Sequence, residues 1–136
     1  MDFYMDDKNV YQRLENEYKK HGKLVILFDF DDTVHDTYHR GEDKFSQVRE
    51  LLRRWRPYAT LIVHTVAPES KYPYIEEYLS SRSIPYDGIN TDADVNLGTR
   101  KIYANATLDD RCGLATMYHV LKELVERIER GEVVRD

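Results

Sequence analysis

The chain has 136 residues, which suffice for one domain and leave little room for a second. Its composition, 41% hydrophobic and 33% charged, excludes an intrinsically disordered chain. Its formal net charge of -5 gives no general attraction to nucleic acid or to an anionic membrane surface. The single cysteine, Cys112, excludes an internal disulfide and a cysteine-rich zinc site, and we therefore expect a reducing, cytoplasmic location.

Signals for membrane insertion or export are not expected either. The longest apolar run, residues 24–28, is far too short to cross a bilayer. The N-terminal stretch MDFYMDDKN is acidic and contains no apolar run, so we expect no signal peptide. The sequence therefore predicts a soluble globular protein without a membrane partner.

The first half of the chain alternates between helical and strand patterns. Apolar residues at helical spacing predict a helix over residues 8–20. Residues 23–30, KLVILFDF, form an apolar run that ends in acid, which is typical of a strand buried on both faces. A second helical pattern covers residues 42–56 and is ended by Pro57, and ATLIVH, residues 59–64, is a second buried strand.

The second half continues the alternation. We expect a helix over residues 73–82, a short strand over residues 86–89 and a loop over residues 90–100. A fourth strand lies within residues 102–108, and a last helix covers residues 114–130. Strands that alternate with helices predict an α/β fold, in which a parallel sheet is sandwiched between helices in three layers.

Polar side chains follow three of these strands, at the sheet edge where α/β proteins bind ligands. The carboxyl ends of parallel strands meet at one edge, so we expect these side chains to share a crevice. They are the acids Asp29, Asp31 and Asp32 after the first strand, Thr65 after the second, and Asp109 and Asp110 after the fourth, with Lys101 shortly before it. The sequence thus predicts up to five carboxylates, a hydroxyl and an ammonium in one site.

This set of side chains indicates phosphoryl-transfer chemistry. Clustered carboxylates repel one another and need a cation, and oxygen ligands favour Mg²⁺. One carboxylate, Asp29 or Asp31, can attack phosphorus to give an aspartyl-phosphate, while the other exchanges protons with the leaving group and with water. Thr65 can donate a hydrogen bond to a phosphate oxygen, and Lys101 can neutralise charge on the phosphoryl group.

The same residues resemble the four motifs of the haloacid dehalogenase-like (HAD) superfamily. The first motif is Asp29-x-Asp31-x-Thr33-Val34, and the others are Thr65 after an apolar strand, then Lys101, then Asp109-Asp110. They occur in the family's order and span about residues 24–112. The stretch RKIYANATLDDR, residues 100–111, is also similar to the third and fourth motifs of short HAD proteins of bacteria and phages.

The resemblance implies a doubly wound parallel sheet with a strand order of about 3-2-1-4. It implies a single HAD-like domain over residues 1–136, made of an N-terminal helix within 1–22, a catalytic core over 23–112 and a C-terminal helix over 113–131. The two positions where the family inserts cap domains hold only short segments. We therefore expect a capless protein with an open site, or one that borrows a lid from a partner subunit.

Roles for individual residues also follow from the resemblance. Asp29 would be the nucleophile and a metal ligand, and Asp31 the general acid/base with its backbone carbonyl on the metal. Thr65 would bind the phosphoryl group, and Lys101 would be the lysine of the third motif. In the acidic pair, Asp110 aligns best with the family's direct metal ligand, and Asp109 would lie behind it. The short flap over residues 35–40 offers His39 and Arg40 for contact with substrate.

We therefore expect a Mg²⁺-dependent phosphatase that acts on a small phosphomonoester through an aspartyl-phosphate. The net charge argues against nucleic acid as a partner, but a nucleotide fits the resemblance of residues 109–111 to small nucleotidases. The eleven tyrosines and the missing cap are compatible with a homodimer.

Plainer interpretations stay open for each residue. The first two acids could belong to an ordinary strand-end turn, and the acidic pair could cap the last helix. Lys101 could be a surface lysine, and Lys71 competes with it because it follows Thr65 closely. His64, within a buried strand, is expected to be a core histidine. The alternative functions are a receiver-like signalling module that accepts phosphate on an aspartate and a non-catalytic phosphate-binding protein.

Overall fold

The computed structural model describes residues 1–95 and 97–136 of the chain. The helices among these residues are α1 (Asp7–His21), α2 (Ser46–Trp55), α3 (Tyr72–Ser81) and α4 (Leu114–Glu129). The strands are β1 (Leu24–Phe28), β2 (Ala59–Val63), β3 (Gly88–Ile89) and β4 (Ala106–Leu108). Short 3-10 turns lie at Phe3–Met5, Glu42–Phe45, Arg56–Tyr58 and Glu69–Lys71. Each predicted helix and strand is present, although the first turn of the helix predicted from residue 42 is the 3-10 turn Glu42–Phe45, and β4 occupies only the end of its predicted range.

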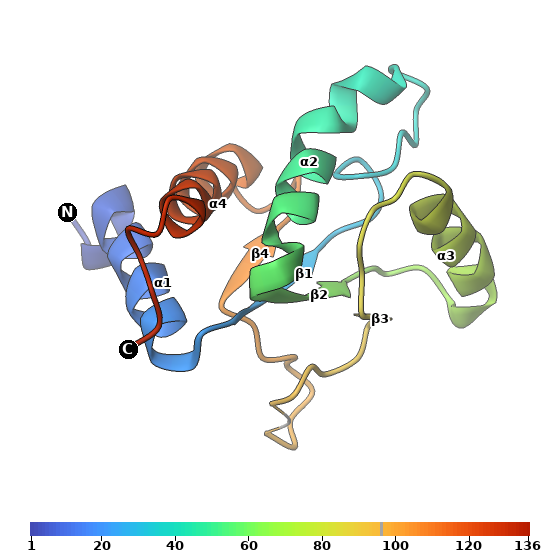
Figure 1. Cartoon of the computed structure of the whole chain (residues 1–136). Helices are drawn as coiled ribbons and strands as arrows, with labels where there is room; N and C mark the ends of the chain where they lie inside the picture. The colour runs from blue at the N-terminus through green and yellow to red at the C-terminus, as the bar shows by residue number, and fades with distance from the viewer. Residues whose placement is uncertain (96) are drawn as a thin grey trace.

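The four strands form one parallel sheet in the order β3-β2-β1-β4 (Figure 1). Phe28 at the end of β1 is level with Val63 of β2 on one side and with Leu108 of β4 on the other. The ends of these three strands therefore share one edge of the sheet. The predicted α/β class and the strand order 3-2-1-4 are confirmed, with helices flanking the sheet.

The hydrophobic core lies between one face of the sheet and the helices. Alternate strand residues point into it, namely Leu24, Ile26, Phe28, Ala59, Leu61, Val63, Ala106 and Leu108. All four helices contribute to the same cluster, for example with Leu14 of α1, Trp55 of α2 and Leu79 of α3. The indole of Trp55 donates a hydrogen bond to the carbonyl of Leu121 in α4 at 3.2 Å, so its burial leaves no unpaired polar group.

The opposite face of the sheet is covered by irregular chain. Leu27 and Ile62 are only 5% and 1% exposed, yet they lie outside the main cluster. The connection between β3 and β4, residues 90–105, lies below the sheet in Figure 1, and its described residues form no helix. Residues of this connection line two cavities on this side, with volumes of about 760 and 440 Å³. The larger cavity reaches the edge where β1 and β4 end.

Local signals explain where the helices begin and end. The side chain of Asp6 accepts a hydrogen bond from the amide of Lys8 at 3.0 Å and caps α1, which ends at Gly22 with a left-handed φ of 71°.

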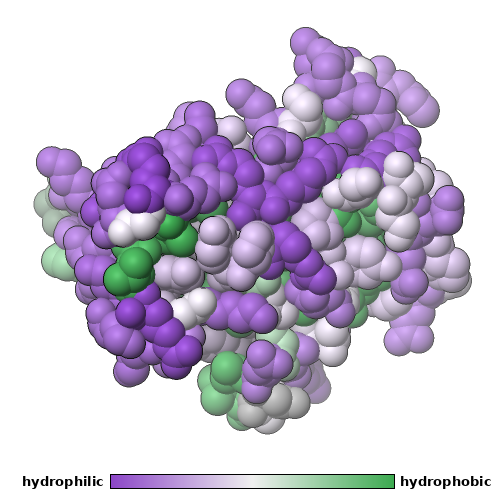
Figure 2. Space-filling view, in the orientation of Figure 1, coloured by the Kyte–Doolittle hydropathy of each residue, from purple (hydrophilic) through white to green (hydrophobic). Residues whose placement is uncertain are grey.

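The molecular face in Figure 2 is mainly hydrophilic, with hydrophobic side chains in small separate patches. Within the described ranges, no helix has both the length and the apolar composition needed to cross a membrane.

Candidate active site

The chain turns sharply as it leaves β1. Asp29 is the first residue beyond the strand, and its amide still donates to the carbonyl of Leu108 at 2.9 Å. The amide of His35 then donates back to the carbonyl of Phe30 at 2.9 Å, which closes a tight turn. Asp32 lies at the bend with a φ of 62°, a left-handed conformation that Asp tolerates better than most residues. The strand fixes Asp29 at the sheet edge, and the bend redirects the residues that follow.

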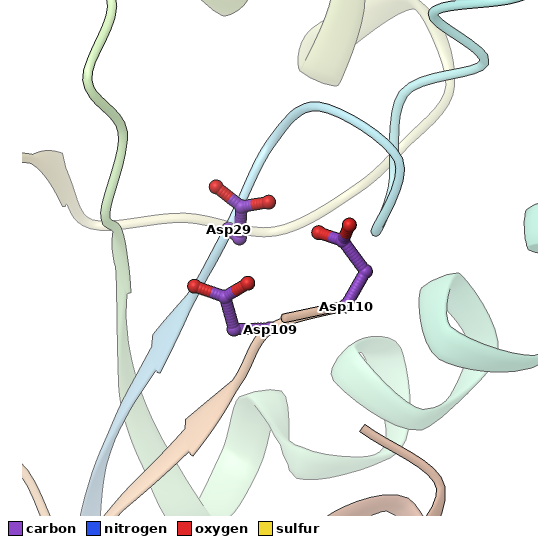
Figure 3. Close-up of side chains that lie close together, drawn as sticks. All are labelled: Asp29, Asp109 and Asp110. Carbon is purple, nitrogen blue, oxygen red and sulfur yellow. The ribbon is translucent and has the colours of Figure 1, made fainter. Parts of the chain in front are cut away.

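Three carboxylates converge at this edge. Asp29, Asp109 and Asp110 each offer an oxygen within 4.8 Å of the oxygens of the other two. Figure 3 shows the three carboxylates rising on the same side from the ends of β1 and β4. Asp29 and Asp109 are half-buried, and Asp110 is exposed. Acids about eighty residues apart in sequence are therefore neighbours because β1 and β4 are adjacent and parallel.

Thr33 joins the two sides of this cluster. Its side chain is buried, and its hydroxyl oxygen lies 3.1 Å from Oδ1 of Asp110 and 3.3 Å from Oδ2 of Asp29. The same oxygen accepts a hydrogen bond from the amide of Asp110 at 3.1 Å. A hydroxyl can accept while donating its own hydrogen, so Thr33 fixes the relative position of the two acids.

No cation of the described chain compensates these acids: none of the ion pairs among residues 1–95 and 97–136 includes Asp29, Asp109 or Asp110. Burial, a hydrogen bond with Asp110 and the charges of Asp109 and Asp110 raise the pKa of Asp29 to about 7. The protein alone therefore holds a proton on this cluster near neutral pH. Clustered oxygen donors without a counter-charge fit a hard divalent cation such as Mg²⁺.

The side chain of Asp31 lies apart from these three. It is 51% exposed and accepts a hydrogen bond from the hydroxyl of Thr37 at 3.0 Å, with Nδ1 of His35 at 3.5 Å. Asp32 also lies outside the group, and its Oδ1 is buried without a hydrogen-bond partner. The structure thus brings together three of the five carboxylates that were expected to converge, because the chain turns from Phe30 onward and carries Asp31 and Asp32 away from Asp29. A backbone carbonyl of Asp31 on the metal stays a prediction.

Thr65 is the second residue beyond the end of β2 and is 9% exposed. Its backbone is held by Asn90, whose side chain accepts from the amide of Thr65 at 2.9 Å and donates to its carbonyl at 2.7 Å. The hydroxyl oxygen accepts a hydrogen bond from the amide of Ala67 at 3.1 Å. Because that bond uses the oxygen only, the hydroxyl hydrogen remains free to donate to a ligand.

Lys101 is exposed and makes no hydrogen bond or ion pair through its ammonium within the described part of the chain. It lines the open cleft of about 760 Å³ together with His64, Asp109 and Cys112. The cleft connects the lysine to the acidic edge, but no direct contact with Asp29 is present. Lys71 ends the turn Glu69–Lys71 after β2, is also exposed and does not line this cleft.

The prediction that His64 is a buried core histidine is wrong. β2 ends at Val63, and His64 is exposed beyond it while its amide donates to the carbonyl of Phe28 at 2.8 Å. Alternation along the strand points its side chain to the face opposite the core, where it lines the cleft. The apolar run before it suggested burial, but the strand is one residue shorter than predicted.

The flap after β1 is an ordered turn. The carboxylate of Asp36 accepts hydrogen bonds from the amides of Arg40 and Gly41 at 2.7 and 2.9 Å. His39 and Arg40 are exposed and contact none of the three clustered acids, so their suggested role with substrate stays a prediction.

Sequence reasoning gave no role to three residues that organise the site. Thr33 connects Asp29 to Asp110, Asn90 holds Thr65, and His35 lies beside Asp31. The position of Thr33 four residues after Asp29 in the motif was an available signal. Asn90 follows the third strand and was assigned to the loop, and no spacing reveals that a ring such as His35 will stack on Phe30 at 4.6 Å.

Comparison with known proteins adds information on the fold. No family model matches the chain, and no curated protein matches it. Among solved structures, the chain is similar to a conserved protein from Bacteroides thetaiotaomicron. The two share 24% sequence identity and a TM-score of 0.59, over 74% of this chain and 91% of the other. At this level of identity, the similarity supports the fold alone.

Proposed function

We propose that this chain is a Mg²⁺-dependent phosphomonoesterase of the HAD superfamily that acts through a phosphorylated Asp29. The observation that carries the proposal is the convergence of Asp29 with Asp109 and Asp110 at the carboxyl edge of a parallel sheet. Ligands of such sheets bind at this edge. Because many families with different activities share this kind of fold, the proposal rests on the site residues and their order.

The three clustered acids would hold the ion, with the backbone carbonyl of Asp31 as a further ligand. Bound Mg²⁺ neutralises negative charge on the phosphoryl group and keeps the acids ionised. A carboxylate oxygen of Asp29 attacks phosphorus, and the bond from phosphorus to the leaving oxygen breaks. Asp31 gives that oxygen a proton, and it later takes a proton from the water that hydrolyses the aspartyl-phosphate. Thr33 keeps Asp29 and Asp110 in register throughout.

Two further residues act on the phosphoryl group. The hydroxyl hydrogen of Thr65 would donate to a phosphoryl oxygen, since the hydroxyl oxygen already accepts from Ala67. Lys101 would bring its unpaired charge to the same group from the cleft. The cleft of about 760 Å³ would receive the organic part of a small phosphomonoester, and a nucleotide falls within that range of size.

The test is release of inorganic phosphate from p-nitrophenyl phosphate and from a panel of phosphorylated metabolites, with Mg²⁺ and with EDTA. We expect Mg²⁺-dependent release by the wild type and none above background by Asp29→Asn. Asp2→Asn is the matched control, because Asp2 is an exposed acid far from the site in sequence whose side chain caps nothing. Equal release by the wild type and Asp29→Asn across the panel would contradict the mechanism.

Two further measurements separate the alternative functions. A receiver-like module would become stably phosphorylated on an aspartate by a small phosphodonor such as acetyl phosphate, without turnover. A non-catalytic protein would fail to bind Mg²⁺ together with a phosphate mimic such as beryllofluoride. Turnover with many product molecules per chain distinguishes the phosphatase from both.

A further inference from the structure

A chain of hydrogen bonds leads from α3 to the carboxylate of Asp31. The hydroxyl of Tyr74 lies 2.9 Å from Nε2 of His35, and Nδ1 of His35 lies 2.9 Å from the hydroxyl oxygen of Thr37. The Thr37 hydroxyl in turn lies 3.0 Å from Oδ1 of Asp31. His35 and Thr37 belong to the flap, whereas Tyr74 belongs to α3. The hydrogen bonds therefore connect two separate elements.

The direction of donation along this chain is fixed by the carboxylate at its end. An ionised Asp31 can only accept, and its Oδ1 at 3.0 Å is a closer acceptor for the single hydrogen of the Thr37 hydroxyl than the carbonyl of His35 at 3.4 Å. Thr37 must then accept from His35, which places the imidazole hydrogen on Nδ1. Nε2 is left as an acceptor and takes the hydroxyl hydrogen of Tyr74. Tyr74, His35 and Thr37 therefore each donate in the direction of Asp31.

The imidazole in the middle of this chain is clamped by aromatic rings. The ring of His35 stacks on Phe30 with centroids 4.6 Å apart and planes 16° apart. Tyr78 and Tyr74 contact it edge-on, at 4.4 and 5.7 Å. Tyr78 is itself fixed, because its hydroxyl accepts from Arg49 at 2.9 Å and donates to a carboxylate at 3.1 Å. His35 therefore holds one ring orientation, which keeps Nδ1 aimed at Thr37.

We propose that Tyr74, His35 and Thr37 are positioning residues that fix Asp31 for its work as general acid and base, an inference that rests on the proposed function. Thr37 occupies Oδ1 and leaves Oδ2 of Asp31 to carry the transferred proton. As the phosphorus–oxygen bond breaks, that proton moves from Oδ2 to the leaving oxygen, and Asp31 becomes a carboxylate. The same oxygen then takes a proton from the water that attacks phosphorus of the aspartyl-phosphate.

The proposal predicts a dependence on the leaving group. An alkyl alcohol leaves only with a proton from the general acid, whereas p-nitrophenolate leaves well without one. A misplaced Asp31 should therefore slow attack on alkyl phosphates far more than attack on aryl phosphates. The parameter to compare is kcat/KM, because it includes the steps up to formation of the aspartyl-phosphate and excludes its hydrolysis.

The experiment compares wild type, Thr37→Val and Thr37→Ser on glycerol 2-phosphate and on p-nitrophenyl phosphate with Mg²⁺. Thr37→Val keeps the side-chain shape and removes the hydroxyl. We expect it to lower kcat/KM for glycerol 2-phosphate by about 30-fold, within the range of general acid catalysis, and for p-nitrophenyl phosphate by less than about threefold. Thr37→Ser should restore the wild-type ratio, and Tyr74→Phe should change the ratio in the same direction by a smaller factor.

Two controls keep the result interpretable. Thr116→Val alters an exposed threonine at the start of α4 and should leave both substrates unchanged. Thermal unfolding of each variant checks that the fold is intact. An equal loss on both substrates, or no loss on either, would overturn the proposal while Mg²⁺- and Asp29-dependent turnover by the wild type still stood. If the wild type itself lacked that turnover, the proposed function would fail first, and this inference with it.

Discussion

Glu15 on α1 lies among hydrogen-bond donors and cations, whereas Asp29 at the end of β1 lies beside two further carboxylates. The side chain of Glu15 accepts from Gln12 at 3.0 Å and from Arg127 of α4 at 2.8 Å, and the residue is 6% exposed. Burial acts to raise the pKa of Glu15, but its hydrogen bonds and the nearby positive charges lower it overall. The fold supplies every partner that this carboxylate needs.

The pKa of Asp29 is shifted in the opposite direction. Burial and the neighbouring acids raise its pKa to about 7, and Thr33 is the hydroxyl that holds it in place. An acid that serves stability comes with its counter-charge, whereas Asp29 requires a proton or an external cation at neutral pH. This edge of the sheet therefore lowers the stability of the metal-free protein at neutral pH. Four predictions test that contrast.

The largest effect concerns activity. Asp29→Asn should lower Mg²⁺-dependent phosphate release by roughly a thousandfold or more, because an amide cannot attack phosphorus. Glu15→Gln should leave kcat within about twofold and act on stability alone. Steady-state kinetics on p-nitrophenyl phosphate measures both. A large loss of kcat in a folded Glu15→Gln protein would contradict the assignment of Glu15 to stability and of Asp29 to catalysis.

A smaller effect concerns the pair that joins α1 to α4. Arg127→Ala removes the nearer of the two cations beside the buried carboxylate of Glu15, leaves Lys19 at 3.8 Å, and should lower Tm by about 5 °C, since a buried carboxylate that loses a partner keeps the cost of its burial. Arg130→Ala is the matched control, because Arg130 pairs with Glu132 at the exposed end of the same helix and its loss should hardly change Tm. Similar Tm values for the two variants would show that the buried pair has no special weight.

The third prediction is a gain in stability instead of a loss. The folded pKa of Asp29, about 7, lies above its ordinary value of 3.8, so its contribution to stability is complete below pH 3.8 and is lost as pH rises through 7. Metal-free Asp29→Asn should therefore be more stable than metal-free wild type at pH 8, by about 2 kcal/mol after allowance for partial exposure, and equal to it at pH 4. Urea unfolding with EDTA measures the difference, and parallel pH profiles of the two proteins would contradict it.

The smallest effect concerns Glu42, which follows the flap and pairs with Arg49 and Arg82. Hydrogen bonds from Arg82 and Arg49 lower the pKa of Glu42 to about 2. A depressed pKa gives stability that is complete above the ordinary value of 4.5 and is lost as pH falls toward 2. Because Glu42 is largely exposed, the loss should be modest, and Glu42→Gln should remove it. Tm measured from pH 6 to pH 2 on both proteins checks this, and identical slopes would count against it.

The sequence was informative about the fold because its signals are local and agree with one another. The apolar run before Asp29 and the alternation of helices and strands predicted the parallel sheet, and the strand order 3-2-1-4 came from the resemblance to a family. The nearness of Asp29 to Asp109 and Asp110 also followed, since it requires only that β1 and β4 end at the same edge.

The rest depended on geometry that residue spacing does not encode. Asp31 is separated from Asp29 within the tight turn that starts at Phe30 and includes the left-handed residue Asp32. The sequence allowed a turn after the strand, but the direction of each side chain depends on the folded backbone. His64 lines the cleft because it is the first residue beyond β2 and, next to the core residue Val63, its side chain lies on the opposite face of the sheet. The contact of His35 with Tyr74 joins the flap to α3 across 39 residues, and only the packed structure reveals it.

The central claim is that Asp29, Asp109 and Asp110 share one hard cation, and calorimetric titration of the metal-free protein with Mg²⁺ at pH 7.5 tests it most directly. We expect one bound ion for the wild type and for Asp2→Asn, with affinity at least about tenfold weaker for Asp29→Asn and for Asp110→Asn. Unchanged affinity in both site variants, or no binding by the wild type, would contradict it.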